Sequence, residues 1–137
     1  MNIHSVSTQF ESGLAFTATI DQYKIKMDTT DDNSQHLGPS PKKLMLAALA
    51  GCTGIDVVSI LNKMQVTFSH FSIRTDASLT EEHPKIYDKV AIVYAINVFA
   101  DDRHKVERAV QLSKEKYCGV SAMFGHFATI DWEIEFL

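Results

Sequence analysis

The stretch SPKKLMLAALAGCTGIDVVSILNKM, residues 40–64, decides the fold. Ser40 is a good helix N-cap and Pro41 suits the first helical position, so the sequence predicts one long helix over residues 41–64. From Leu44 to Leu61 this helix is apolar almost all round, which a single apolar stripe facing one sheet does not explain. We therefore expect protein to surround the helix on all sides.

The same apolar run is close to the length that a membrane span requires. Asp56 lies well inside the run, Gly51 and Gly54 weaken an isolated helix, and no second span occurs in the sequence. A core helix shared between two subunits explains the pattern equally well, because one small sheet cannot cover so much apolar surface. The sequence therefore predicts a symmetric homodimer and no membrane partner.

Composition limits the other function classes. The chain has 137 residues with 45% hydrophobic residues, which fits one domain over residues 1–137 with its own core. The net charge is −4 and the basic residues are scattered, so nucleic acid is not an expected partner. Residues 2–12 are polar and interrupted and do not form a signal-peptide core, so we expect a cytoplasmic protein.

Outside the long helix the sequence alternates mostly with the period of strands. Strands are predicted over residues 2–10 (weakly), 14–20, 23–28, 66–77, 90–98 and 130–136, with a loop over 29–39 and a connection over 79–87. A second helix should begin at Asp101 or Asp102 and end near Gly119. Because the connections are short and strands and helices do not alternate, the fold class is α+β. We predict a mainly antiparallel sheet with two main helices, in the order βββ-α-ββ-α-β.

The two cysteines are the first candidates for chemistry. Cys52 lies inside the long helix, where a buried thiol is expected, and Cys118 lies at the end of the second helix. From the residues alone they are buried hydrophobic residues, a redox pair, or unrelated. Their spacing matches no zinc site, and His83, His104 and His126 also lack ligand spacing, so neither a metal nor a cofactor is predicted.

Three segments resemble the OsmC/Ohr superfamily of osmotically inducible and organic-hydroperoxide-resistance proteins. They are residues 40–64 around Cys52, EEHPKIYDKVAIVYAI at 81–96, and VERAVQLSKEKYCGVSAMF at 106–124 around Cys118. The resemblance implies an intertwined homodimer with the long helices at its centre. It also implies a peroxidase of the oxidative stress response, in which Cys52 attacks an organic hydroperoxide and becomes a sulfenic acid. Cys118 would then form a disulfide with Cys52, and a lipoylated or small dithiol would reduce it.

The sequence departs from the family's peroxidases at the groups that activate the thiol. In those proteins an arginine from the N-terminal strands and a glutamate at the start of the long helix assist the attacking cysteine. Here no arginine precedes Arg74, and Lys42 occupies the position that matches the glutamate. Lys42 or Lys43 of a second subunit is the candidate replacement, while Asp56, one turn after Cys52, would raise the thiol pKa. We therefore predict a slow thiol, with a pKa no lower than about 8.5.

Two hypotheses from different classes follow. The first is a thiol-dependent peroxidase that acts on organic hydroperoxides, with Cys52 as nucleophile and Cys118 as the resolving cysteine. The second is a non-catalytic or weakly active homodimer that binds a small apolar ligand or responds to redox conditions. Independently of both hypotheses, Asp56 in an apolar helix is expected to be a satisfied buried polar group and not an acid catalyst. A redox pair requires the fold to bring Cys52 and Cys118 within reach of a disulfide, which we predict.

Overall fold

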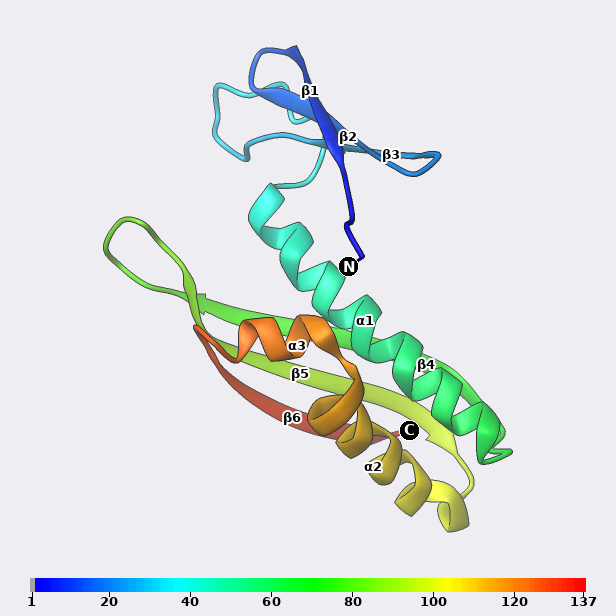
Figure 1. Ribbon diagram of the computed structural model, residues 1–137. Coiled ribbons are helices and arrows are strands. Elements are labelled where there is room, and N and C mark those ends of the chain that lie inside the picture. Colours follow the sequence, from blue (N-terminus) through cyan, green and yellow to red (C-terminus); the bar gives the residue numbers. More distant parts are fainter. Residues whose placement is uncertain (1) are drawn as a thin grey trace. The chain divides into compact units, whose positions relative to one another are not determined.

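The computed structural model describes residues 2–137 (Figure 1). Its contacts divide the chain into an N-terminal unit that ends at Met45 and a C-terminal unit, Leu46–Leu137. That the chain acts as one domain remains a prediction.

The N-terminal unit is the predicted three-stranded meander. Its antiparallel strands are β1 (Ser7–Ser12), β2 (Ala15–Ile20) and β3 (Tyr23–Met27), in the order β1-β2-β3. The loop that follows is fastened by the buried Asp28, whose carboxylate accepts backbone hydrogen bonds from Thr29 at 2.7 Å and Leu37 at 3.1 Å. A side chain at Gly38 would collide with the backbone carbonyl of Lys26, so only glycine fits there.

The long helix α1 spans Pro41–Lys63 and confirms the central prediction. Ser40 Oγ accepts a hydrogen bond at 3.1 Å from a backbone N–H of the first turn, which is the predicted N-cap. At the other end Gln65 adopts a left-handed conformation with φ 58°, and the Val66 N–H donates to the Leu61 carbonyl at 2.9 Å. This pattern is a Schellman motif, which ends the helix without a glycine.

The C-terminal unit contains a second sheet in the order β4-β5-β6, with β4 at Phe68–Leu79, β5 at Tyr87–Val98 and β6 at Thr129–Phe136. Strands β4 and β5 are antiparallel, as predicted, whereas β5 and β6 are parallel. The expectation that strands and helices do not alternate was therefore wrong here. Parallel neighbours need a crossover, and the helical segment between β5 and β6 provides it.

That crossover differs from the single helix predicted up to Gly119. It consists of a 3₁₀ turn (Ala100–Asp102), helix α2 (Arg103–Leu112), a π-helical turn (Ser113–Tyr117) and helix α3 (Gly119–Phe124). Gly119 thus begins a helix instead of ending one. Asp102 precedes α2 but makes no side-chain cap, because its carboxylate pairs with Lys105 at 3.3 Å.

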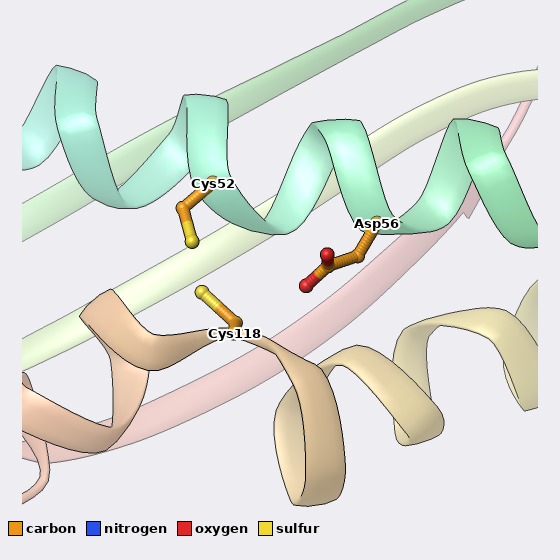
Figure 2. A group of neighbouring side chains, drawn as sticks. All are labelled: Cys52, Asp56 and Cys118. Atoms are coloured by element: carbon orange, nitrogen blue, oxygen red, sulfur yellow. The ribbon is translucent and has the colours of Figure 1, made fainter. Parts of the chain in front are cut away.

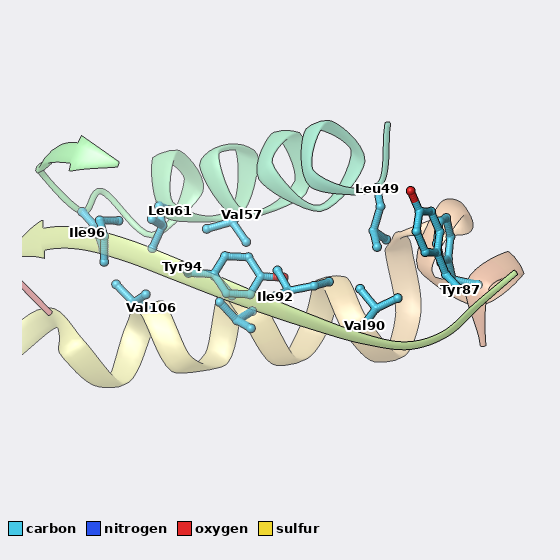
Figure 3. Packing of buried hydrophobic residues seen from close by; sticks show 13 residues of the cluster. Leu49, Val57, Leu61, Tyr87, Val90, Ile92, Tyr94, Ile96 and Val106 are labelled. Atoms are coloured by element: carbon cyan, nitrogen blue, oxygen red, sulfur yellow. The ribbon is translucent and has the colours of Figure 1, made fainter. Parts of the chain in front are cut away.

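The core of the C-terminal unit lies between its helices and one face of its sheet (Figure 3). Leu49, Val57 and Leu61 project from α1 onto the alternating residues of β5 that include Ile92 and Tyr94, and all five side chains are fully buried. By length and composition α1 also qualifies as a membrane span. Its buried residues instead belong to this core cluster, so α1 is a core helix.

Within the C-terminal unit, residues 46–137, one face of α1 is buried. Leu49, Thr53, Val57 and Leu61 are buried at helical spacing, whereas Ile55 on another face is 73% exposed. A side chain at Gly51 would meet no atom within 4 Å. The predicted cover on all sides is therefore incomplete in one copy of the chain, and a large apolar residue faces solvent.

Candidate functional site

The fold of the C-terminal unit brings Cys52, Asp56 and Cys118 together (Figure 2). Cys52 and Asp56 stand one turn apart on α1 and project toward Cys118, which lies at the junction of the π-helical turn and α3. The two Sγ atoms and a carboxylate oxygen of Asp56 all lie within 4.8 Å of one another. The predicted approach of the two cysteines is confirmed, and both are free thiols in this structure.

The backbone holds Cys118 from both sides. Its N–H donates to the Ser113 carbonyl at 2.9 Å, which closes the π-helical turn. Its Sγ accepts a hydrogen bond from the Ser121 N–H at 3.3 Å, and its carbonyl accepts one from Ser121 Oγ at 3.0 Å. Cys118 is therefore a fixed, buried thiol, only 4% exposed.

Cys52 is the more accessible thiol of the pair. The sequence predicted that it would be buried inside the long helix, but the structure leaves it half-buried. The reason is that the face of α1 that packs on the sheet is set by Thr53 and Val57, which places Cys52 at the edge of that face. A small molecule could thus reach Cys52 before it reaches Cys118.

A chain of hydroxyl groups runs from the core to Asp56. Ser113 Oγ donates to Asp56 Oδ2 at 2.9 Å, and Thr53 Oγ1 lies 2.8 Å from Ser113 Oγ and 2.7 Å from the Tyr94 hydroxyl. Each hydroxyl has one proton to donate. Because Ser113 donates to Asp56, it must accept from Thr53, which in turn must accept from Tyr94. Asp56 is therefore a satisfied polar group, as one hypothesis expected, held at the end of an oriented chain.

Sequence reasoning missed the three hydroxyl residues of this chain. Thr53 gave a weak signal as a polar residue inside an apolar helix. Tyr94 falls in the strand predicted over residues 90–98 and Ser113 in the predicted second helix, and neither pattern marks them as functional. Only the tertiary structure shows that they meet, because they come from α1, β5 and the π-helical turn.

Burial raises the pKa of the Cys52 thiol, and the nearby Cys118 thiol and Asp56 carboxylate raise it further. A backbone hydrogen bond at Val120 lowers the pKa but does not reverse the direction. Lys42 and Lys43 lie in the first turn of α1, within the N-terminal unit. Their role as activating cations from a second subunit therefore stays a prediction.

A surface pocket of about 370 Å³ opens beside Asp56. It is lined by Asp56, Ser59, Ile60, Lys63, Met64, Leu112 and Tyr117. The histidines named above lie elsewhere: His83, His104 and His126 are exposed. Across residues 2–137, none of the three joins a group of metal-ligating side chains.

Comparisons with known proteins identify the family of this chain. The model of the family described as OsmC-like protein matches residues 29–133. Protein YhfA of Escherichia coli is 36% identical over 93 residues, which are 68% of this chain and 69% of that protein.

Two solved structures illustrate the range of the likeness. A hypothetical protein from Aquifex aeolicus has a TM-score of 0.88 at 28% identity, covering 100% of this chain and 98% of the other. The organic hydroperoxide resistance protein OhrB of Bacillus subtilis has a TM-score of 0.64 at 18% identity, covering 98% of each chain, which shows a shared fold. The chain therefore belongs to the OsmC-like protein family, within the OsmC/Ohr superfamily.

Proposed function

We propose that this protein is a thiol-dependent peroxidase that reduces organic hydroperoxides through Cys52 and Cys118. The observation that carries the proposal is the pair of free sulfur atoms within 4.8 Å, one half-buried and one buried. A solvent-reachable thiol can meet the peroxide, and a fixed thiol behind it can resolve the product. The name of the fold relative from Bacillus subtilis supports the substrate class.

The chemistry uses each sulfur once. The Cys52 thiolate attacks one peroxide oxygen, the O–O bond breaks, and the alcohol leaves after taking up a proton, so that Cys52 becomes a sulfenic acid. Cys118 then attacks the Cys52 sulfur, forming the disulfide and releasing water. A dithiol reductant restores both thiols by two thiol–disulfide exchanges and is itself oxidised to a disulfide.

The structure also supports the second hypothesis at one point. The raised pKa of Cys52 means that little thiolate is present near neutral pH, so the first step is slow. A protein of this kind could be oxidised once without efficient turnover and serve as a redox-responsive or ligand-binding dimer. The two functions differ in turnover, not in the first oxidation.

The exposed face of α1 supports the homodimer. Ile55 is 73% exposed in the single chain, next to the open space at Gly51, and Phe10 and Tyr23 of the N-terminal sheet are exposed as well. Apolar surface of this kind is typically covered by a second subunit. We expect the dimer to work in the cytoplasm, without nucleic acid or membrane partners.

Turnover is tested by following consumption of cumene hydroperoxide with dihydrolipoamide as the reductant. The peroxidase proposal predicts repeated turnover by the parent protein and none by Cys52→Ser. Turnover by Cys118→Ser should be slower, because the dithiol must then reduce the Cys52 sulfenic acid without an internal disulfide. Consumption by the parent that stops after one equivalent supports the redox-responsive alternative. Equal consumption by parent and Cys52→Ser contradicts both.

A further inference from the structure

Two thiols and a carboxylate converge in this site without a positive charge among them. Cys52 and Cys118 become negative when they react, and Asp56 adds a further acidic group within 4.8 Å of both sulfur atoms. In a peroxidase this carboxylate works against the chemistry, because it opposes formation of the thiolate. The arrangement would be balanced by a cation bound between the three groups.

We propose that Cys52, Cys118 and Asp56 form a binding site for a zinc ion, with water as the fourth ligand. Zn²⁺ takes four ligands in a tetrahedron, from thiolate sulfur at about 2.3 Å and carboxylate oxygen at about 2.0–2.2 Å. Such distances place neighbouring ligand atoms about 3.6–3.8 Å apart. The observed ligand atoms lie within 4.8 Å of one another, so a contraction of about 1 Å or less completes the site.

The ligands are held on regular elements. Cys52 and Asp56 share one face of α1 because a spacing of four residues is close to one helical turn. Cys118 is fixed at the end of the π-helical turn by its hydrogen bond to Ser113. The sequence did not indicate a metal site, because the two cysteines are far apart and the third ligand, Asp56, is neither a cysteine nor a histidine. The fold brings the three side chains together.

Polar groups behind the ligands orient them. Ser113 donates to Asp56 Oδ2 and so holds the carboxylate in place, with lone pairs left over for a metal ion. The Ser121 N–H donates to Cys118 Sγ, which stabilises a thiolate at that position. Residues that bind a metal are typically held in this way by hydrogen bonds from neighbouring groups that do not bind the metal themselves.

Soft ligands decide which ion fits. Two thiolates exclude magnesium and calcium, which prefer all-oxygen sites, and favour zinc among the abundant divalent ions. Cys52 and Asp56 are both half-buried and not fully enclosed, so an ion can reach them from solvent. Zinc binding does not depend on the peroxidase proposal, since it needs the reduced thiols and not their turnover.

The test is titration of the reduced full-length protein with Zn²⁺ against a chromophoric chelator, and with Co²⁺ as a spectroscopic probe. We expect one ion per chain and, with Co²⁺, the thiolate charge-transfer and intense visible bands of a tetrahedral site. Asp56→Asn should weaken Zn²⁺ binding by about tenfold or more, and Cys118→Ser by more than that. Glu107→Gln, which removes an exposed carboxylate on α2, is the matched control and should bind as the parent does.

A measurement without substitutions guards against misfolded variants. Oxidation of the zinc-loaded protein with diamide joins the two thiolates in a disulfide, transfers two electrons to diamide, and should release the ion. Retention of zinc by the disulfide form would overturn the proposal. So would Asp56→Asn binding as tightly as the parent, or the absence of binding by the reduced parent. None of these experiments measures peroxide turnover, so the zinc proposal and the peroxidase proposal can fail separately.

Discussion

The thiol of Cys52 should ionise late, and this is the prediction that the structure makes most sharply. The perturbation is pH, applied to Cys118→Ser in the presence of a metal chelator, so that Cys52 is the reacting thiol. Burial raises the pKa of Cys52, and Asp56 raises it further. Burial is the largest cause, so the direction persists when the second cysteine is replaced.

The magnitude follows from the ordinary pKa of a thiol. At a pKa of about 8.5, about 3% of the thiol is ionised at pH 7, so a raised pKa leaves less than about 3% as thiolate. The alkylation rate should then rise nearly tenfold per pH unit around pH 7 and should still be rising at about pH 8.5. Asp56→Asn should move the whole profile to lower pH, because the carboxylate no longer opposes the thiolate.

The assay is alkylation by iodoacetamide at a series of pH values, followed by intact mass spectrometry. Glu107→Gln in the same background controls for a general change in surface charge and should leave the profile unchanged. A rate that is already flat above about pH 7 would refute the reasoning, since the thiolate would then form near neutrality. An activating cation, such as Lys42 or Lys43 of a second subunit, would have to be present.

Three further outcomes are expected. Thr53→Val removes the shared partner of the Tyr94 and Ser113 hydroxyls and should lower the free energy of unfolding, measured by urea denaturation, by about 1–3 kcal/mol. A loss below about 0.5 kcal/mol would contradict the buried chain of hydroxyl groups. Burial raises the pKa of Tyr94 above the value of about 10 that it has in the unfolded chain, so the stability gained from the neutral Tyr94 is complete below about pH 10 and is lost as pH rises further. Tyr94→Phe should therefore lose less stability between about pH 9 and about pH 11 than the parent does. Equal losses in the two proteins would contradict the raised pKa. Ile55→Glu should dissociate the proposed homodimer, as measured by sedimentation velocity. A sedimentation coefficient equal to that of a dimeric parent would exclude the exposed face of α1 from the interface.

The sequence was sufficient for the elements whose signals are local. The start of α1 followed from Ser40 and Pro41, because capping is decided by neighbouring residues. Strands β5 and β6 followed from strict alternation, as in Ile130 and Trp132, which pack on the core while Asp131 faces solvent.

What the sequence did not predict depends on contacts between distant segments. The π-helical turn and α3 continue a helical pattern without a breaker, and Gly119 was misread as an end signal. The parallel pairing of β5 and β6 is decided by how the crossover packs, which periodicity does not encode. The proximity of Asp56 to Cys118 is also tertiary: the sequence placed Asp56 beside Cys52, but only the fold adds Cys118 and the hydroxyl of Ser113.

Intact mass spectrometry after one equivalent of cumene hydroperoxide shows whether Cys52 and Cys118 act as one redox pair. The parent protein should lose about two mass units, the two hydrogen atoms released when the disulfide forms. Cys52→Ser should not change in mass, and Cys118→Ser should gain one oxygen as a sulfenic acid. An unchanged mass for the parent, or a parent that only gains oxygen atoms, would contradict the account.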